Sequence, residues 1–298
     1  MIKQGRPVLE IKNLNVVLSR QSSRILRDVS LSVDSGDVHG LVGESGAGKS
    51  MIGKAIAGLL PKAIRTVSGS IRISGVDLGD LSPAERRNFI GKNTAIIPQD
   101  PLSALNPSRR IGPQMTDRLI HTLGWSRKKA DARVLDMLDQ VHMPNPERVV
   151  RAYPHELSGG MRQRVLIAAA FAAEPKLIIA DEPTTALDVT VQKQILRLIN
   201  EMQEKSHTAL LFVTHDMGVV AKICQHVSVL YQGHITEQCD VEKLFSGDCH
   251  AYARELIAAT PRYDRPEQTL KPISQIGLEE LNAEIAALDL AWEASNNG

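Results

Sequence analysis

The feature that most constrains the fold is a glycine-rich octapeptide, Gly43-Glu44-Ser45-Gly46-Ala47-Gly48-Lys49-Ser50. It follows an apolar run, 38–42, that predicts a buried strand, and it precedes the stretch 51–59, which predicts a helix. A strand, a glycine-rich loop and a helix in this order are the context of a phosphate-binding P-loop. The sequence therefore predicts an α/β protein that binds a di- or triphosphate.

The chemistry of phosphate binding explains the composition of this loop. Three glycines let backbone N–H groups turn inward around a phosphate chain, and the following helix directs its positive end at the same anion. Lys49 is expected to reach the β and γ phosphates as a mobile point charge. The hydroxyl of Ser50 is expected to ligate Mg²⁺.

Composition and charge exclude several function classes. The 298 residues include 35 lysines and arginines against 34 acidic residues, so the overall charge favours neither nucleic acid nor an acidic lipid surface. We expect no signal peptide, because the N-terminal residues 1–7 lack an apolar core, and no apolar run is long enough for a membrane span. The three cysteines, Cys224, Cys239 and Cys249, are widely spaced and read as ordinary reduced thiols.

The order of patterns predicts a mostly parallel sheet covered by helices on both faces. Two alternating stretches, 8–18 and 25–33, predict an antiparallel pair before the P-loop. Ser82-Pro83-Ala84-Glu85 predicts a capped helix that runs toward Ile90. Further strands are predicted after the P-loop helix, and they cover 69–75, 94–98, 177–182, 209–214 and 227–231. A helix is predicted at 189–205.

Two segments interrupt this alternation. Between residues 100 and 154, two helical patterns at 114–123 and 128–141 follow each other with no strand between them, which indicates a helical insertion. After Thr260, three prolines predict a linker, and apolar residues at helical spacing in 278–288 predict an acidic amphipathic helix. This last helix either docks on the chain or a partner, or forms a loosely held tail.

Asp181 and Glu182 end an apolar strand of the predicted sheet. In a P-loop protein this position faces the phosphates, so Asp181 is expected to hold Mg²⁺ and Glu182 to polarise the water that attacks the γ-phosphate. Two carboxylates after an apolar run also occur where a strand simply reaches solvent. The P-loop elsewhere in the chain favours the catalytic interpretation.

A second candidate anion site lies in Leu157-Ser158-Gly159-Gly160-Met161, before a predicted helix at 162–173. Ser158 is expected to cap that helix, and the glycines to expose N–H groups at its positive end. With these motifs, the chain resembles the ATP-binding-cassette (ABC) ATPases. The resemblance adds Gln99, the stretch Ala186-Leu187-Asp188, and His215, all in the order of that family.

The resemblance implies the ABC ATPase fold, with ATP and Mg²⁺ as ligands. It implies a P-loop core at 1–98 and 175–245 that includes an antiparallel β-subdomain, a helical signature subdomain at 99–174, and a C-terminal extension at 246–298. The residues implied to be catalytic are Glu182, His215, Lys49 and Gln99, and those implied to hold Mg²⁺ are Ser50, Gln99 and Asp181. The residues implied to bind ATP within the same subunit are Gly43, Glu44, Ser45, Gly46, Ala47, Gly48, Lys49, Ser50 and Met51.

The family also implies a head-to-tail pair of ATPase subunits. ATP would lie between the P-loop of one subunit and the LSGG loop of the other, so Ser158, Gly159, Gly160 and Asp188 would act on the nucleotide held by the partner. Gln99 would link the ATP site to the helical insertion, which receives a coupling helix from a membrane subunit. His215 would hydrogen-bond the γ-phosphate and keep Glu182 and the water in register.

Within the family, the chain is similar to the dipeptide, oligopeptide and nickel importer group. The similarity rests on the stretch 99–107, on Met161, on the stretch 250–256 and on Thr260-Pro261-Arg262. It implies two permease subunits, an extracytoplasmic solute-binding protein, a second and different ATPase chain, and no nucleic acid. The expected location is peripheral, on the cytoplasmic face of the inner membrane, and the solute class is peptides or a related small solute such as a nickel or metal chelate or an opine-like compound.

Two departures from that group matter. Many members carry a cysteine-rich segment that binds an iron–sulfur cluster, whereas residues 263–298 contain no cysteine, so we expect no cluster. Relatives also often stack adenine on an aromatic residue near the end of the first strand, and no aromatic residue occurs before Phe89. An aliphatic contact there is expected to hold adenine less tightly, by about 1 kcal/mol.

Two alternatives stay open at this point. One is a cassette ATPase that acts on nucleic acid or an enzyme complex without a permease, although the long coiled-coil insertions, tandem cassettes or basic stripes of such proteins are absent from the sequence. The other is a regulatory cassette that does not hydrolyse ATP. The presence of Lys49, Ser158, Glu182 and His215 argues against it.

Overall fold

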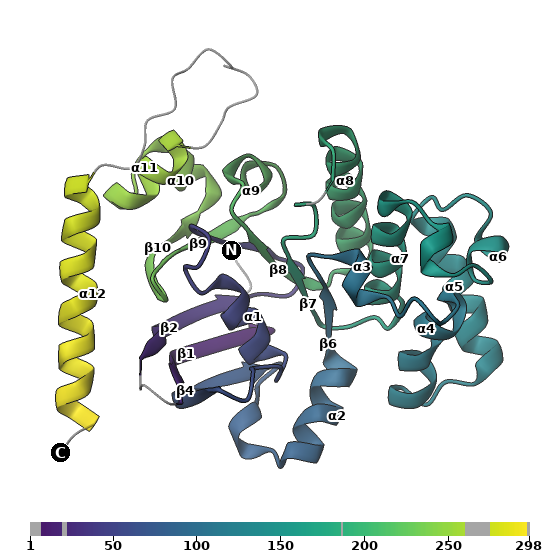
Figure 1. Cartoon of the computed structure of the whole chain (residues 1–298), viewed down its shortest axis with the longest axis horizontal. Coiled ribbons are helices and arrows are strands. Elements are labelled where there is room, and N and C mark those ends of the chain that lie inside the picture. Colours follow the sequence, from purple (N-terminus) through teal and green to yellow (C-terminus); the bar gives the residue numbers. More distant parts are fainter. Residues whose placement is uncertain (1–6, 20–22, 186, 260–274, 297–298) are drawn as a thin grey trace, which may run out of the picture. The chain divides into compact units, whose positions relative to one another are not determined.

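The computed structural model describes residues 7–19, 23–185, 187–259 and 275–296 (Figure 1). The chain divides into two compact units. The first unit comprises Met1–Val8, Asp34–Asp37 and Asp80–Leu211. The second comprises Leu9–Val33, Val38–Gly79 and Phe212–Gly298.

The second unit contains a four-stranded antiparallel sheet in the order β2-β1-β4-β5. Its strands are β1 (Leu9–Leu18), β2 (Arg24–Val33), β4 (Ile64–Ile73) and β5 (Val76–Asp77). In the second half of β2, buried apolar residues alternate with exposed polar ones, which is the period expected of a sheet with one covered face. The predicted antiparallel pair is confirmed, since Leu9 pairs with Val33 and Ile11 with Leu31.

A second group of strands in this unit supports the glycine-rich loop. β3 (Val38–Val42) pairs in parallel with β9 (His226–Tyr231), and β9 pairs antiparallel with β10 (His234–Asp240). All five residues of β3 are buried, as the largely apolar run 38–42 predicts. β10 is not predicted from the sequence, because its polar residues HITEQCD lack an apolar run.

Helices complete the second unit. α1 (Lys49–Ile56) follows the glycine-rich loop, and the C-terminal part forms α9 (Met217–Ile223), α10 (Val241–Ser246), α11 (Ala251–Ala259) and α12 (Gln275–Asn296). α12 is the helix that the spacing in 278–288 predicts, and it packs on this chain through the buried Leu281 and Ile285. The predicted proline linker lies outside the described residues.

The strands of the first unit are β6 (Thr94–Ile97) and β7 (Leu177–Asp181), which pair in parallel. β8 (Ala209–Thr214) runs across the division between the units. α2 (Pro83–Asn93) begins with the predicted capping box, in which Ser82 and Glu85 exchange hydrogen bonds. A 3₁₀ turn, η1 (Leu78–Asp80), precedes it.

The helical part of the first unit follows β6, as the sequence predicts. It consists of α3 (Pro101–Ala104), α4 (Ile111–Asp117), a π-helical turn η2 (Arg118–Thr122), α5 (Arg127–Gln140), α6 (Pro146–Val149), a 3₁₀ turn η3 (Pro154–Glu156) and α7 (Gly159–Ala172). After β7 comes α8 (Val189–Ser206), the helix predicted at 189–205. α4 begins three residues before the predicted start. Its first turn is fixed by backbone bonds from Ile111 and Gly112 to the carbonyls of Ala152 and Val150.

Candidate functional site

The glycine-rich loop joins β3 to α1 in the second unit, as the sequence predicts. Gly43, Gly46 and Gly48 all have positive φ, at 153°, 85° and 105°. A Cβ on Gly43 would clash with the carbonyl oxygen of Leu230, so glycine is required there by space as well as by conformation. The loop therefore turns tightly above the end of β3, with Glu44, Ser45 and Gly46 exposed at its tip.

The side chain of Lys49 binds the backbone at the start of this loop. Its side chain is buried, and its ammonium group donates hydrogen bonds to the carbonyl oxygens of Gly43 (2.7 Å) and Glu44 (2.9 Å). Burying a lysine is favourable only when its charge meets such acceptors. The arrangement places a cation within the ring of the loop, where a phosphate chain is expected to bind.

α1 begins with Gly48 in the left-handed region, and no side chain in the described chain caps its first turn. Ser50 and Met51 lie in this turn and are half-buried. A helix start without a side-chain cap suits an anion, because backbone N–H groups and the helix dipole both favour negative charge there.

His39 is a residue of this region that sequence reasoning missed. It lies in β3, is buried, and shares a 2.8 Å hydrogen bond between its Nε2 and the hydroxyl of Ser228. Burial, aided by the neighbouring His226, lowers the pKa of His39 to about 4. The imidazole is therefore neutral at neutral pH, and a polar residue within an apolar run was the available signal for it.

His215 belongs to the same unit and directly follows β8. Its side chain is exposed. The next residue, Asp216, caps α9 by accepting hydrogen bonds from the N–H groups of Gly218 and Val219. The sequence placed His215 at a strand end, and the structure has it there.

In the first unit, Gln99 and Glu182 lie together at the carboxyl ends of β6 and β7. The parallel register pairs Ile97 with Ala180, and each of the two side chains comes two residues later. Gln99 accordingly donates a 3.1 Å hydrogen bond from Nε2 to Oε2 of Glu182. The structure thus brings together two residues that are 83 positions apart in the sequence.

The backbone and one further side chain fix the orientation of Glu182. Glu182 has a positive φ of 46°, which is uncommon for a residue with a side chain and is often found at functional positions. The hydroxyl of Thr185 donates to the same Oε2 at 3.0 Å. Sequence reasoning missed Thr185, although a hydroxyl three residues after the carboxylate was a usable signal. Asp181, the last residue of β7, is half-buried.

The second glycine-rich loop lies before α7. Ser158 caps that helix, since its hydroxyl accepts a hydrogen bond from the N–H of Met161 at 3.3 Å. Gly159 follows and is exposed, and Gly160 is half-buried. Arg162 links α7 to the segment that precedes it, because its Nε donates a 2.7 Å hydrogen bond to the carbonyl oxygen of Pro154. The predicted cap is confirmed.

Asp188 caps the neighbouring helix α8. One of its carboxylate oxygens accepts hydrogen bonds from the N–H groups of Thr190 (3.0 Å) and Val191 (2.9 Å). α8 packs close to the LSGG loop, because a Cβ on Gly160 would lie 3.2 Å from Cγ1 of Val191. Ala186, which the sequence grouped with Asp188, lies outside the described residues.

The donor set fits a nucleotide with Mg²⁺ better than a metal held by protein alone. Mg²⁺ is usually bound by one or two protein oxygens together with phosphate oxygens and water. Ser50 in the second unit and Asp181 in the first unit each offer one oxygen of this kind. Within the described ranges, no group of three or more histidine, cysteine or acidic side chains is arranged to hold a metal ion.

Across the part of the chain that the structure describes, no helix is both long enough and apolar enough to span a membrane.

Comparisons with known proteins agree with this geometry. The family model described as ABC transporter matches residues 26–185. The chain is 44% identical over 268 residues to a probable peptide ABC transporter ATP-binding protein, y4tR, of Sinorhizobium fredii, a match covering 89% of this chain and 80% of that protein. It is 43% identical over 264 residues to the oligopeptide transport ATP-binding protein OppD of Bacillus subtilis, covering 88% and 74%.

A solved structure confirms the predicted fold class. The dimeric ATP-binding cassette MJ0796, in a post-hydrolysis state bound to ADP and Pi, matches with a TM-score of 0.69 and 25% identity. The match covers 78% of this chain and 98% of that one. The antiparallel sheet, the parallel strands and the surrounding helices therefore form the ABC ATPase fold.

Proposed function

The chain belongs to the ABC transporter family, as an ATP-binding subunit of its dipeptide and oligopeptide importer group, and from this premise we propose that it hydrolyses ATP to drive import of peptides or related small solutes. The observation that carries the proposal is the position of Glu182, which Gln99 and Thr185 hold at the end of β7. The names of the relatives favour peptides over nickel as the solute class.

The loop of the second unit supplies phosphate binding in this proposal. The N–H groups of 43–51 and the ammonium of Lys49 bind the phosphate chain, since the loop already surrounds that cation. Ser50 and Asp181 hold Mg²⁺, assisted by Gln99. When bound, Mg²⁺ neutralises charge on the phosphate oxygens.

Glu182 is the proposed general base. Its carboxylate takes a proton from the attacking water while the water oxygen bonds to the γ-phosphorus and the bond from that phosphorus to the bridging oxygen of ADP breaks. Gln99 and Thr185 orient the carboxylate, because both donate to its Oε2. His215 is proposed to hydrogen-bond the γ-phosphate.

The second glycine-rich loop is proposed to act on a nucleotide held by a partner ATPase subunit. Ser158, Gly159 and Gly160 offer the N-terminal end of α7, and Asp188 shapes the adjacent loop. The dimeric form of the similar cassette MJ0796 supports a paired arrangement. We propose that the partner is a different ATPase chain.

We further propose the remaining parts of the assembly. Two permease subunits and an extracytoplasmic solute-binding protein complete the importer, with this chain at the cytoplasmic face of the inner membrane. The subdomains expected from the sequence, 1–98 with 175–245, 99–174 and 246–298, are proposed as its functional divisions.

The catalytic part is tested by Glu182→Gln in the assembled complex. We expect ATP to bind with its normal affinity while the turnover falls by about 10²–10⁴-fold, which is the usual contribution of a general base. Glu201→Gln, at a half-buried position of α8 that pairs with Arg197, is the matched control. Unchanged phosphate release by the Glu182 variant would reject this assignment.

The transport part is tested by isolating the chain from its native membrane in mild detergent and identifying the proteins that copurify. Recovery of two permeases and a second ATPase with an LSGG motif supports the importer. Recovery of only water-soluble partners would contradict it and leave the ATPase chemistry standing.

A further inference from the structure

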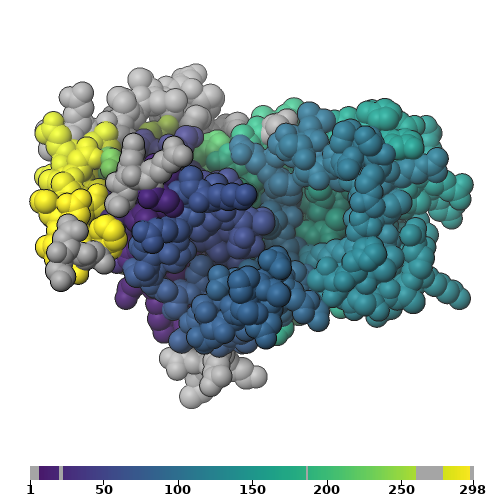
Figure 2. All heavy atoms as spheres, turned by 60° about the horizontal axis from the view of Figure 1, so that its bottom comes forward, coloured from purple at the N-terminus to yellow at the C-terminus, as the bar shows by residue number. Residues whose placement is uncertain are grey.

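α12 is an acidic helix of the second unit, and none of the residues proposed to bind or hydrolyse ATP lies on it. Residues 275–296 contain five acidic side chains and neither lysine nor arginine. Its apolar side is buried at Leu281 and Ile285, which are 3% and 5% exposed. Figure 2 shows the helix lying against the N-terminal strands of the same unit.

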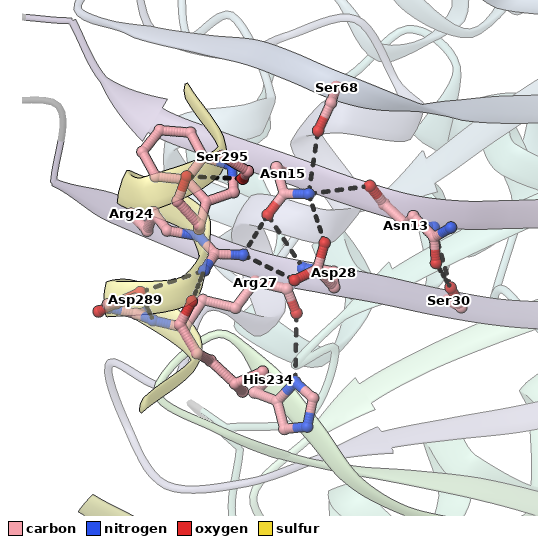
Figure 3. A network of polar contacts seen from close by, with 12 residues as sticks. Asn13, Asn15, Arg24, Arg27, Asp28, Ser30, Ser68, His234, Asp289 and Ser295 are labelled. Atoms are coloured by element: carbon pink, nitrogen blue, oxygen red, sulfur yellow. Dashed lines mark hydrogen bonds and ion pairs between the residues drawn. The ribbon is translucent and has the colours of Figure 1, made fainter. Parts of the chain in front are cut away.

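Asp289 anchors this helix to β2. Its two carboxylate oxygens accept hydrogen bonds from Nε (2.9 Å) and Nη2 (2.8 Å) of Arg27, a bidentate geometry (Figure 3). Arg24 donates from Nη1 to Asp289 at 3.3 Å and to the carbonyl oxygen of Leu288 at 3.0 Å. The guanidinium of Arg24 also lies 5.2 Å from the ring centre of Trp292.

The anchor continues into the sheet. The buried guanidinium of Arg24 donates to the side chains of Asn15 and Asp28. Burial alone would raise the pKa of the Asp28 carboxyl, but the hydrogen bonds from Asn15 and Arg24 outweigh it, and the pKa is lowered. The Asp28 carboxylate is therefore charged at neutral pH, and it pairs with Arg24, one of the two arginines that bind Asp289 of α12.

Arg27, which binds Asp289 of α12, also contacts the turn between β9 and β10. Gln232 and Gly233 form the turn, with positive φ at both residues (43° and 78°), as in a type I′ hairpin. The backbone N–H of Arg27 donates to the carbonyl oxygen of Gly233 at 2.8 Å, and its Nη1 donates to that of Gln232 at 2.5 Å.

Asn282 of α12 contacts the same turn directly. Its Oδ1 accepts hydrogen bonds from the hydroxyl of Tyr231 (2.9 Å) and from Nε2 of Gln232 (2.9 Å). Two residues of α12 that lie about two helical turns apart are thus linked to this turn, Asn282 directly and Asp289 through Arg27.

The β9–β10 turn also contacts the phosphate-binding loop. The N–H of Gly233 donates to the carbonyl oxygen of Ala47 at 2.7 Å. Gly43 packs so closely on the carbonyl oxygen of Leu230 that no side chain fits between them. Tyr252, which is buried and packs edge-on against Tyr231 at 4.9 Å, also lies close to Glu44 of the loop.

We propose that α12 is a support, within the same chain, for the phosphate-binding loop, and that Asp289 and Asn282 are positioning residues that strengthen ATP binding. The inference rests on the proposed function, because it assumes that the loop binds ATP. A loop rich in glycine loses much conformational freedom when it surrounds phosphates, so contacts that fix it beforehand improve affinity. α12 supplies such contacts through Arg27 and the β9–β10 turn.

The test uses the full chain in its assembled complex, with Asp289→Asn and Asn282→Ala as separate variants. Each is expected to raise the KM for ATP about three- to tenfold and to leave kcat unchanged, because saturating ATP restores the ordered loop. The dissociation constant for ATP, measured by calorimetry on the isolated chain, should rise by the same factor. Glu284→Gln, which removes the same charge from an exposed position of α12, should change neither.

The two variants together distinguish loop positioning from simple stabilisation. Because both act through one turn, their combined effect on the dissociation constant should be smaller than the product of the single effects. If both variants lower the melting temperature but leave the affinity for ATP unchanged, α12 is a stabilising element only and the proposal is wrong. If the unmodified chain itself fails to bind ATP, the proposed function fails instead.

Discussion

The two glycine-rich loops of this protein lead into helices in different ways. α1 starts after Gly48, and among the described residues no side chain caps it. α7 starts after Ser158, whose hydroxyl accepts a hydrogen bond from Met161. The first loop is therefore suited to take its missing acceptor from a bound anion, whereas the second completes its own first turn.

This difference separates the expected effects of substitutions. Changes in the first loop should weaken ATP binding by the isolated chain. Changes in the second should leave that binding intact and act only when a partner subunit presents its nucleotide. The predictions that follow test this separation, from the largest effect to the smallest.

Lys49→Ala is expected to weaken ATP binding by the isolated chain by about 3 kcal/mol, or roughly 100-fold, because charged hydrogen bonds to the phosphates are lost. Calorimetric titration with ATP measures the change. Lys54→Ala, in the last turn of the same helix, is the control and should bind normally. If both variants bind ATP equally well, Lys49 does not contribute to phosphate binding and this assignment is wrong.

The strand before the first loop should make the protein sensitive to acid. Burial lowers the pKa of His39 to about 4, below its ordinary value of 6.5, so the unfolded chain takes up a proton first as the pH falls. The contribution of neutral His39 to the free energy of unfolding is thus fully present above pH 6.5. It falls by about 3 kcal/mol in all as the pH declines toward 4. Urea unfolding at several pH values should show this slope, and His39→Gln should flatten it; an equally steep slope in the variant would assign the acid sensitivity to other groups.

Ser158→Ala should destabilise the folded chain by about 1 kcal/mol, because it removes the cap of α7. Ser158→Gly should cost only a few tenths of a kcal/mol, since glycine is tolerated at this position. Chemical denaturation of the two variants measures the difference. Identical losses would show that the hydroxyl does not act as a cap.

Gly159→Ala should have the smallest effect on folding. A Cβ at this position meets nothing within 4 Å, and the residue has no positive φ, so alanine should be neutral or stabilise by up to about 0.5–1 kcal/mol. A thermal melt that shows marked destabilisation would contradict the described loop. If the variant folds normally, a loss of turnover in the assembled complex would come only from a weaker contact between this loop and the nucleotide of the partner subunit.

Local motifs were predictable because neighbouring residues determine them. The loop at 43–50, the capping box at Ser82, the cap at Ser158 and the strand ending at Asp181 each follow from a short stretch of sequence. The parallel pairing of β6 and β7 then brought Gln99 to Glu182, which the family resemblance had implied but the spacing alone had not.

Long-range contacts were beyond the sequence. Arg27 and Asp289 are 262 positions apart, and nothing in the helical spacing of 278–288 indicates which surface the helix covers. β10 was missed because it is polar along its length, and the Gln232-Gly233 turn before it is a less common form of the two-residue hairpin signal. The support of the phosphate-binding loop therefore became visible only in the folded structure.

The separation of the two loops is tested most directly with Ser158→Gly, which keeps the helix stable. The account predicts that the isolated variant binds ATP with unchanged affinity, while turnover in the assembled complex falls at least about tenfold through loss of a contact to the partner's γ-phosphate. A weakened affinity in the isolated chain, or an unchanged turnover in the complex, would contradict it.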